Sequence, residues 1–278
     1  MLASRLPGIL PGLTEAESLE VAAIHSISGR ALDISTWGQR PFRTPHHTAS
    51  AVALVGGGSS PKPGEISLAH NGVLFLDELP EYSRKVLEVL REPLESGQIS
   101  ISRAASQITF PARFQLIAAM NPCPCGYHGH PSIECTDTSL QVAKYRQKLS
   151  GPLLDRFDLH VEVPAQSGDV LIRKTLNTES SETVRARVLN AREMQYQRSG
   201  KANRELSGCE LEEVCQLNEQ SRVLLEGAMN RLGLSARAFH RVLRVARTIA
   251  DLQQVETVST QHITEALGYR KLDRRTTS

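Results

Sequence analysis

A short apolar run that ends in two acidic residues is the feature that most constrains the fold of this chain. Gly72 is followed by Val-Leu-Phe-Leu and then by Asp77 and Glu78. A fully apolar run of this length is typical of a buried strand in a parallel sheet. Groups that contact ligands gather at the carboxyl ends of such strands. The sequence therefore predicts a strand over residues 73–76 that presents two carboxylates at a site.

The two carboxylates suit phosphoryl transfer, which needs a metal ion to neutralise developing charge and a polar group to orient the attacking water. Side chains at a strand end point to opposite sides. We therefore expect Asp77 to bind Mg²⁺ and Glu78 to face the water, as in a Walker B motif. The alternative is that the two acids begin a helix, where carboxylates favour the positive end of the dipole.

The usual partner of a Walker B motif does not precede it. A loop of the form G-x-x-x-x-G-K-[ST] holds phosphates through backbone N–H groups and a lysine, and none occurs between Met1 and Gly72. The missing charge-assisted contacts are worth about 1.5 to 3 kcal/mol each. We therefore expect that these 278 residues alone do not turn over ATP.

Composition indicates an ordinary globular protein, with 40% hydrophobic and 22% charged residues. The net charge of +2 gives no overall attraction to nucleic acid or membrane. No apolar run approaches the ~20 residues that span a bilayer, and the start lacks a secretion signal, which together favour the cytoplasm. Five cysteines, an odd number, do not suggest a disulfide framework.

Strand patterns come first along the chain and helical patterns follow. Thr14 and Glu17 form a capping-box pattern, residues 80–94 have helical spacing, residues 98–110 suggest a hairpin, and residues 114–120 and 159–163 suggest further strands. Helical patterns then cover residues 180–198, 209–232, 235–252 and 259–267. This order predicts an α/β domain over residues 1–166 and an all-α domain over residues 167–278.

Three polar positions outside the acidic pair are candidates for the same chemistry. Asn121 ends a predicted strand and suits orientation of the water, although an asparagine before proline also suits a turn. Arg156 is placed to reach a phosphate of a neighbouring subunit, but on its residues alone an ordinary salt bridge with a flanking aspartate is the better interpretation. Arg237 begins a basic stripe with Arg241 and Arg244, which suits either phosphates or solvent.

A cluster of soft ligands follows Asn121. Cys123, Cys125, Cys135 and Asp137 qualify as zinc ligands, and His128 and His130 lie between them. Zinc takes four such ligands in a tetrahedron, but C-x-C spacing is less diagnostic than C-x₂-C, and reduced thiols without a metal are the alternative. We expect the remaining cysteines, at positions 209 and 215, to be core thiols.

Five motifs occur in one order along nearly the whole chain. They are Arg40-Pro-Phe-Arg-Thr-Pro-His-His-Thr-Ala-Ser50, Pro63-Gly-Glu-Ile-Ser-Leu-Ala-His-Asn-Gly-Val-Leu-Phe-Leu-Asp-Glu78, Ala118-Ala-Met-Asn-Pro-Cys-Pro-Cys-Gly126, Gly151-Pro-Leu-Leu-Asp-Arg-Phe-Asp158 and Leu234-Ser-Ala-Arg-Ala-Phe-His-Arg241. Together they resemble the magnesium-chelatase-like branch of the AAA+ ATPases, most closely its ComM/YifB-like group.

The resemblance implies a P-loop-type parallel sheet, truncated at its amino end, followed by an all-α lid domain. It also implies roles for single residues: Asp77 and Glu78 as Walker B, Asn121 as sensor 1, Arg156 as the arginine finger and Arg237 as sensor 2. Such proteins work as rings, usually hexamers, so Arg156 would serve the ATP of the neighbouring subunit. The hairpin at residues 98–110 would be the element that touches DNA in the pore.

The activity implied is that of an ATP- and Mg²⁺-dependent DNA helicase that extends branch migration in natural transformation and recombination. Two departures from the family pattern qualify it. The Walker A motif would stand immediately before Met1, and Asp137 occupies a position where a cysteine is usual, which bears on Zn²⁺ binding. The alternatives are a non-catalytic module for ring assembly or DNA contact, and the motor subunit of a metal chelatase.

Overall fold

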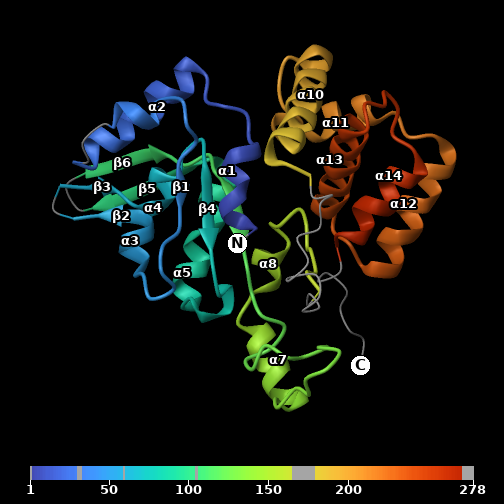
Figure 1. Ribbon diagram of the computed structural model, residues 1–278, viewed down its shortest axis with the longest axis horizontal. Helices are drawn as coiled ribbons and strands as arrows, with labels where there is room; N and C mark the ends of the chain where they lie inside the picture. The colour runs from blue at the N-terminus through green and yellow to red at the C-terminus, as the bar shows by residue number, and fades with distance from the viewer. Residues whose placement is uncertain (1, 30–32, 59, 104–105, 165–178, 271–278) are drawn as a thin grey trace. The chain divides into compact units, whose positions relative to one another are not determined.

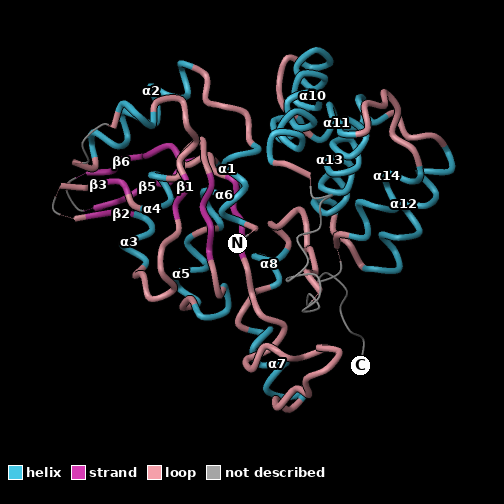
Figure 2. The backbone as a smooth tube through the Cα atoms, viewed as in Figure 1, coloured by secondary structure: helices cyan, strands magenta, loops and turns pink. Residues whose placement is uncertain are grey.

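The structure, a computed structural model, describes residues 2–29, 33–58, 60–103, 106–164 and 179–270. The chain forms two compact units, which are Met1–Leu153 and Leu154–Ser278. The first combines helices with strands, and among the described residues of the second all regular elements are helices (Figures 1 and 2). The predicted order, a parallel α/β part followed by an all-helical part, is confirmed.

A parallel sheet forms the centre of the first unit. Its strands β1 (Phe42–Arg43), β4 (Val73–Leu76) and β7 (Gln115–Ala118) lie in the order β1-β4-β7. Val73 pairs with Phe42 on one side and Gln115 on the other. Gly72 allows this close approach, because a Cβ there would lie 2.1 Å from the Pro41 carbonyl oxygen. The strand predicted over residues 73–76 is confirmed.

Short helical segments surround the sheet. They are η1 (Ala3–Arg5), α1 (Leu6–Ile9), α2 (Glu15–Ile27), η2 (Ile34–Thr36), α3 (Ala51–Val55), α4 (Glu65–Leu68), η3 (Leu79–Glu81), α5 (Arg84–Val89), α6 (Arg91–Ser96), α7 (Ser139–Gln147) and α8 (Gly151–Leu154). Helix α2 begins with the predicted capping box, in which Thr14 Oγ1 accepts from the N–H of Glu17 and Glu17 accepts from the N–H of Thr14. The predicted helix over residues 80–94 is divided at Leu90 between α5 and α6.

Two antiparallel hairpins accompany the parallel sheet. Strands β5 (Gln98–Arg103) and β6 (Ser106–Pro111) pair from Gln98 with Pro111 to Arg103 with Ser106, which confirms the predicted hairpin. Ile99, Ile101 and Phe110 are buried on one face of it. A shorter pair joins β2 (Gly56–Gly57) to β3 (Lys62–Pro63).

A buried histidine fixes the amino ends of the strands. His70 is 2% exposed, its Nδ1 accepts from the N–H of Arg113, and its Nε2 lies 3.0 Å from a Glu20 carboxylate oxygen. The Glu20 carboxylate also accepts from the Asn71 side chain, and the pKa of Glu20 is lowered, first by its hydrogen bond with His70. These contacts join α2 to the starts of β4 and β7, at the edge opposite to the acidic pair.

The second unit is built on α13. Its described helices are α10 (Ser181–Ser199), η4 (Asn203–Glu205), α11 (Gly208–Cys215), α12 (Glu219–Leu232), α13 (Ala236–Leu252) and α14 (Thr260–Gly268). The pattern predicted as one helix over residues 209–232 is interrupted at Gln216, which has a left-handed conformation and ends α11. Asn218 then caps α12 through a hydrogen bond from the N–H of Ser221.

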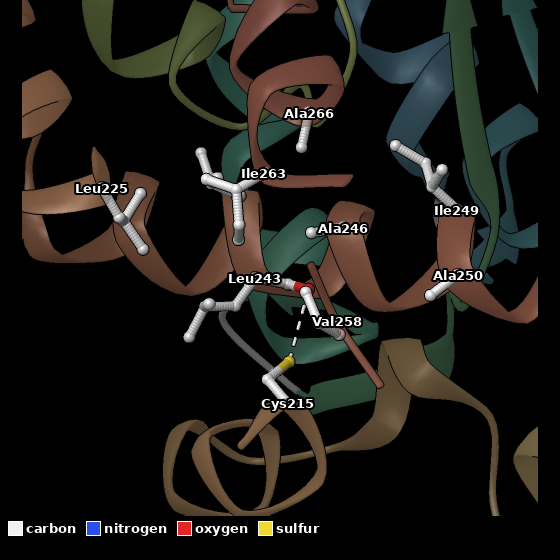
Figure 3. Close-up of a cluster of buried hydrophobic side chains, with 10 residues drawn as sticks. Cys215, Leu225, Leu243, Ala246, Ile249, Ala250, Val258, Ile263 and Ala266 are labelled. Atoms are coloured by element: carbon white, nitrogen blue, oxygen red, sulfur yellow. Dashed lines mark hydrogen bonds between the residues drawn. The ribbon is translucent and has the colours of Figure 1, made fainter. Parts of the chain in front are cut away.

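Apolar side chains from α11 to α14 form one core (Figure 3). Leu225, Leu243 and Ile263 come from three different helices, and each is at most 1% exposed. Cys215 belongs to this core and its Sγ lies 3.7 Å from the Leu243 carbonyl oxygen. The prediction of a core thiol is confirmed for Cys215 and wrong for Cys209, which is exposed at the start of α11.

A buried ionic network lies beside that core. Arg247 and Asp251, one turn apart on α13, are both 0% exposed and are paired at 3.1 Å. Asp251 also accepts from Arg198 of α10 at 2.6 Å and from the side-chain amide of Asn203 at 2.7 Å. Arg247 donates to the carbonyl oxygens of Val255 and Glu256. Every charge in this network therefore has several partners, as buried ions require.

The strand predicted over residues 159–163 is wrong. This stretch has no strand conformation, and Leu159, Val161 and Val163 are 49%, 65% and 65% exposed. The N–H of His160 donates instead to the carbonyl oxygen of Tyr269. The alternating pattern is present, but among the described residues no strand lies beside this segment to pair with it.

Candidate functional site

The acidic pair and Asn121 follow neighbouring strands of the parallel sheet. Asp77 and Glu78 come directly after β4, and Asn121 follows β7. Pairing continues past both strands, since Ala119 donates to the Leu76 carbonyl oxygen and Leu79 donates to that of Ala119, both at 2.9 Å. All three polar side chains belong to exposed residues. The carboxyl edge of the sheet therefore gathers two carboxylates and an amide on an accessible surface.

The backbone of Glu78 is strained. Its φ of 51° and ψ of 48° are left-handed, a conformation uncommon for residues other than glycine and asparagine. The N–H of Glu78 donates to Oδ1 of Asp77 at 3.0 Å, and its Oε2 lies 3.0 Å from Nδ1 of His47. Strain of this kind persists only where surrounding contacts impose it. The geometry fixes the direction in which the Glu78 carboxylate points.

His47 belongs to a loop that follows β1, the strand that pairs with β4 on the side away from β7. The rings of His46 and His47 lie 4.2 Å apart. The hydroxyl group of Tyr82 donates to the Pro45 carbonyl oxygen at 2.6 Å, which anchors the loop. Burial and the nearby Asp77 charge raise the pKa of Tyr82 to about 12, so the hydroxyl keeps its proton. No pattern in the sequence singles out His47, because the two-residue strand that precedes it is too short to be predicted.

Cys123, Cys125, Cys135 and Asp137, together called the Cys/Asp cluster here, have ligand atoms within 4.8 Å of one another. The three sulfur–sulfur distances are 3.3, 3.5 and 3.7 Å. In a tetrahedral zinc site with bonds of about 2.3 Å, neighbouring sulfur atoms lie about 3.8 Å apart. Three thiols and one carboxylate at these separations fit a single tetrahedral ion.

Hydrogen bonds prepare the Cys/Asp cluster for a cation. Asp137 Oδ2 accepts from the N–H of Cys125 at 2.8 Å, and this bond is the first cause of the lowered Asp137 pKa. The pKa of Cys125 is lowered to about 7. The Asp137 carboxylate raises this pKa, but the backbone of Tyr127 and neighbouring side-chain groups lower it by more. His128 and His130 lie outside this cluster, and Nδ1 of His130 accepts from the N–H groups of Ser132 and Ile133.

The remaining candidates lie in the helical unit. Arg156 follows α8, and its carbonyl oxygen accepts from Arg241 at 2.7 Å. The flanking acids are paired with other arginines, Asp158 with Arg241 at 3.1 Å and Asp155 with Arg270 at 3.6 Å. The sequence predicts an α/β domain that extends to residue 166. In the structure, Arg156 lies in the second compact unit, which begins at residue 154.

Arg237 stands in the first turn of α13. The basic stripe that it begins is partly used within the unit, since Arg244 donates to the carbonyl oxygens of Asn203 and Leu206. Arg241 is only 18% exposed in its pair with Asp158. Both of these arginines therefore stabilise the helical unit.

Comparison with known families accounts for both units. The family described as magnesium chelatase, subunit ChlI, matches residues 1–171. The family of the ChlI C-terminal region matches residues 178–270. The chain belongs to the magnesium-chelatase-like AAA+ ATPases.

Within this family the chain is similar to proteins of the ComM and YifB group. It is 54% identical to the competence protein ComM of Haemophilus influenzae and 52% identical to YifB of Escherichia coli, in each case over 99% of the chain. These matches cover 53% and 54% of the relatives, so the chain spans about half their length. A shorter similarity, 33% over 96 residues, relates it to the DNA replication licensing factor mcm6 of Xenopus tropicalis.

Membership of the AAA+ ATPases gives the strand-end residues a chemical context, because proteins of this kind use ATP and Mg²⁺. Asp77, Glu78 and Asn121 lie where the sheet of such an ATPase presents ligand-contacting groups.

No helix in the described part of the chain is both long and apolar enough to cross a membrane.

Proposed function

We propose that this chain is the ATPase part of a ring-forming DNA motor of the ComM type, with a role in branch migration during transformation and recombination. The observation that carries the proposal is the arrangement of Asp77, Glu78 and Asn121 on adjacent strand ends. In this proposal Asp77 binds Mg²⁺, Glu78 activates the attacking water and Asn121 orients it. In this proposal the protein works in the cytoplasm.

Arginines of the helical unit complete the proposed site in a ring, most simply a hexamer. Arg156 would reach the phosphates bound to a neighbouring subunit, and Arg237 those bound to its own. The β5–β6 hairpin would contact DNA in the pore of the ring. The similarity to a competence protein supports the role in transformation, and the shorter similarity to a DNA replication licensing factor supports the DNA role.

A chimera tests the ATPase. The 278 residues replace the matching half of Haemophilus influenzae ComM, to which they are 54% identical. We expect DNA-stimulated ATP hydrolysis by the chimera and a loss of about 100-fold or more with Glu78→Gln, since general bases contribute 10²–10⁴ in rate. Glu92→Gln, at an exposed position of α6, is the matched control. An inactive chimera beside active parental ComM contradicts the proposal.

DNA contact is tested with the same chimera in gel shifts at several salt concentrations. Arg103→Ala should weaken binding and lower the salt dependence, because each phosphate contact releases counterions. Lys85→Ala, an exposed cation of α5, should leave binding unchanged. Equal affinity of the Arg103→Ala chimera and the unchanged chimera would remove the hairpin from the DNA site.

We further propose that the Cys/Asp cluster binds Zn²⁺. Its three thiols and one carboxylate form a donor set that zinc accepts, and structural zinc sites contribute folding free energy. The cluster adjoins the ATPase edge without supplying a residue to it, so the metal has a structural part in this proposal.

The family name indicates a second candidate function, that of the motor subunit of a metal chelatase. Such a motor acts on a partner protein and has no need of DNA. Stimulation of the chimera by DNA but not by a chelatase partner subunit favours the DNA motor, and the reverse result favours the chelatase.

A further inference from the structure

The segment between β7 and α7 holds both Asn121 and the Cys/Asp cluster. Ala119 still pairs with the end of β4, but no helix or strand occurs from there to residue 138. Cys123 and Cys125 lie just after Asn121, and Asp137 lies just before Thr138, which caps α7. The cluster therefore closes the two ends of this segment onto each other.

Helix α7 returns to the start of the same segment. Tyr145 is 6% exposed, and the guanidinium of Arg146 donates to the Pro122 carbonyl oxygen, next to Asn121, at 3.4 Å. Lys148, just after the helix, pairs with Glu81 at 3.0 Å. The end of α7 and the residue after it thus contact the loop that follows β7 and the segment that follows β4.

We propose that the metal held by the Cys/Asp cluster positions Asn121 at the nucleotide edge, by fixing the start of α7 so that its last turn holds the Asn121 loop. Asn121 is then placed by a closed circuit, from the loop through the cluster and α7 back to the loop. This proposal rests on the proposed function only for the meaning of Asn121 in ATP hydrolysis. The circuit itself is a property of the 278 residues.

Chain entropy explains why a metal is needed for this task. A long irregular segment costs conformational free energy to hold in one course, and the cost of closing a loop grows with its length. Cys123 is 0% exposed, and Val142 and Tyr145 of α7 are buried, as is Leu149 just after the helix. A metal that joins Cys123 to Asp137 removes the freedom of the segment between them.

Hydrogen exchange with mass spectrometry tests the circuit on the whole chain. After metal removal by a chelator, amides of residues 115–125 and 139–147 should exchange roughly tenfold faster or more, a change that corresponds to about 1.4 kcal/mol. Amides of the β5–β6 hairpin and of α13 should not change, which excludes general unfolding. Added Zn²⁺ alone should restore the slow exchange.

Two variants separate the metal from the contact that it supports. Cys135→Ser should abolish metal binding and reproduce the fast exchange, whereas Cys209→Ser, at an exposed thiol outside the cluster, should do neither. Arg146→Ala should keep the metal but speed exchange at residues 115–125, because it lacks the guanidinium that donates to the Pro122 carbonyl oxygen. Unchanged exchange at residues 115–125 in metal-free protein would overturn the proposal, as would failure of the wild-type chain to bind Zn²⁺.

ATP hydrolysis by the ComM chimera distinguishes this inference from the proposed function. A zinc-dependent course of residues 115–125 in an inactive chimera leaves the circuit standing and removes the ATPase proposal. An active chimera whose exchange and rate do not respond to metal leaves the ATPase standing and removes the circuit.

Discussion

Nδ1 of His47 lies 3.0 Å from Oε2 of Glu78, so side chains join the loops that follow β1 and β4. Glu78 has a left-handed backbone and its N–H donates to Asp77. The Glu78 carboxylate is thus positioned by His47, and the Glu78 main chain is positioned by the Asp77 carboxylate. Such a contact determines where a water-activating carboxylate points.

Loss of the His47 imidazole should therefore slow ATP hydrolysis without abolishing nucleotide binding. In the ComM chimera we expect His47→Ala to lower kcat by about 10- to 100-fold with little change in KM, since small misplacements of catalytic groups cost up to about 100-fold. His47→Gln keeps a hydrogen-bonding group and should retain more of the rate. His46→Ala is the control, because His46 bonds Thr48 within its own loop; an equal loss there would contradict a specific role for His47.

Much of the α/β unit could be predicted from local pattern. The apolar run before Asp77 predicted β4, the alternation over residues 98–110 predicted the hairpin, and Thr14 with Glu17 predicted the start of α2. Each of these signals depends on residues close in sequence. The strand over residues 159–163 failed because a strand also needs a neighbour to pair with, and local pattern does not report one.

The site shows the same division. Asp77, Glu78 and Asn121 could be singled out because each follows an apolar run. The contact of His47 with Glu78 joins positions far apart in the chain, and the sequence contains no local signal of that distance. The four cluster ligands were recognisable by residue type, but the course of the chain decides which candidates come together, and it leaves His128 and His130 outside the cluster.

Zinc content tests the Cys/Asp cluster directly. The purified chain should contain about one equivalent of zinc, because structural zinc sites bind tightly, and Cys135→Ser should contain less than ~0.2 equivalents. Asp137→Cys supplies a fourth thiolate, a softer ligand, and should hold zinc against a chelator for longer than wild type. Metal analysis and competition with a chelator measure both. Less than ~0.2 equivalents in wild type would remove the zinc proposal.

The two cysteines of the helical unit should differ in reactivity. Cys215 is 1% exposed, and burial raises the pKa of its thiol to about 11, whereas Cys209 is exposed. Because the thiolate is the reactive form, an alkylating reagent at pH 8 should label Cys209 within the time in which Cys215 stays unmodified. Mass spectrometry of the peptides reports each site. Denatured protein, in which both thiols react, is the control, and equal labelling of the folded chain would contradict the buried position of Cys215.

Removal of the Asp251 carboxylate should be the most destabilising single change in the buried ionic network. Asp251→Ala leaves the fully buried Arg247 with carbonyl partners only, and takes away the acceptor shared by Arg198 and Asn203. Breaking a buried pair in this way costs about 3 to 5 kcal/mol. Denaturant unfolding followed by circular dichroism measures the loss. Glu179→Gln breaks an ion pair with Arg187 whose two side chains are about half exposed, and should cost less than ~1 kcal/mol. A similar cost for both variants would mean that Asp251 does not hold the helical unit together through its charge.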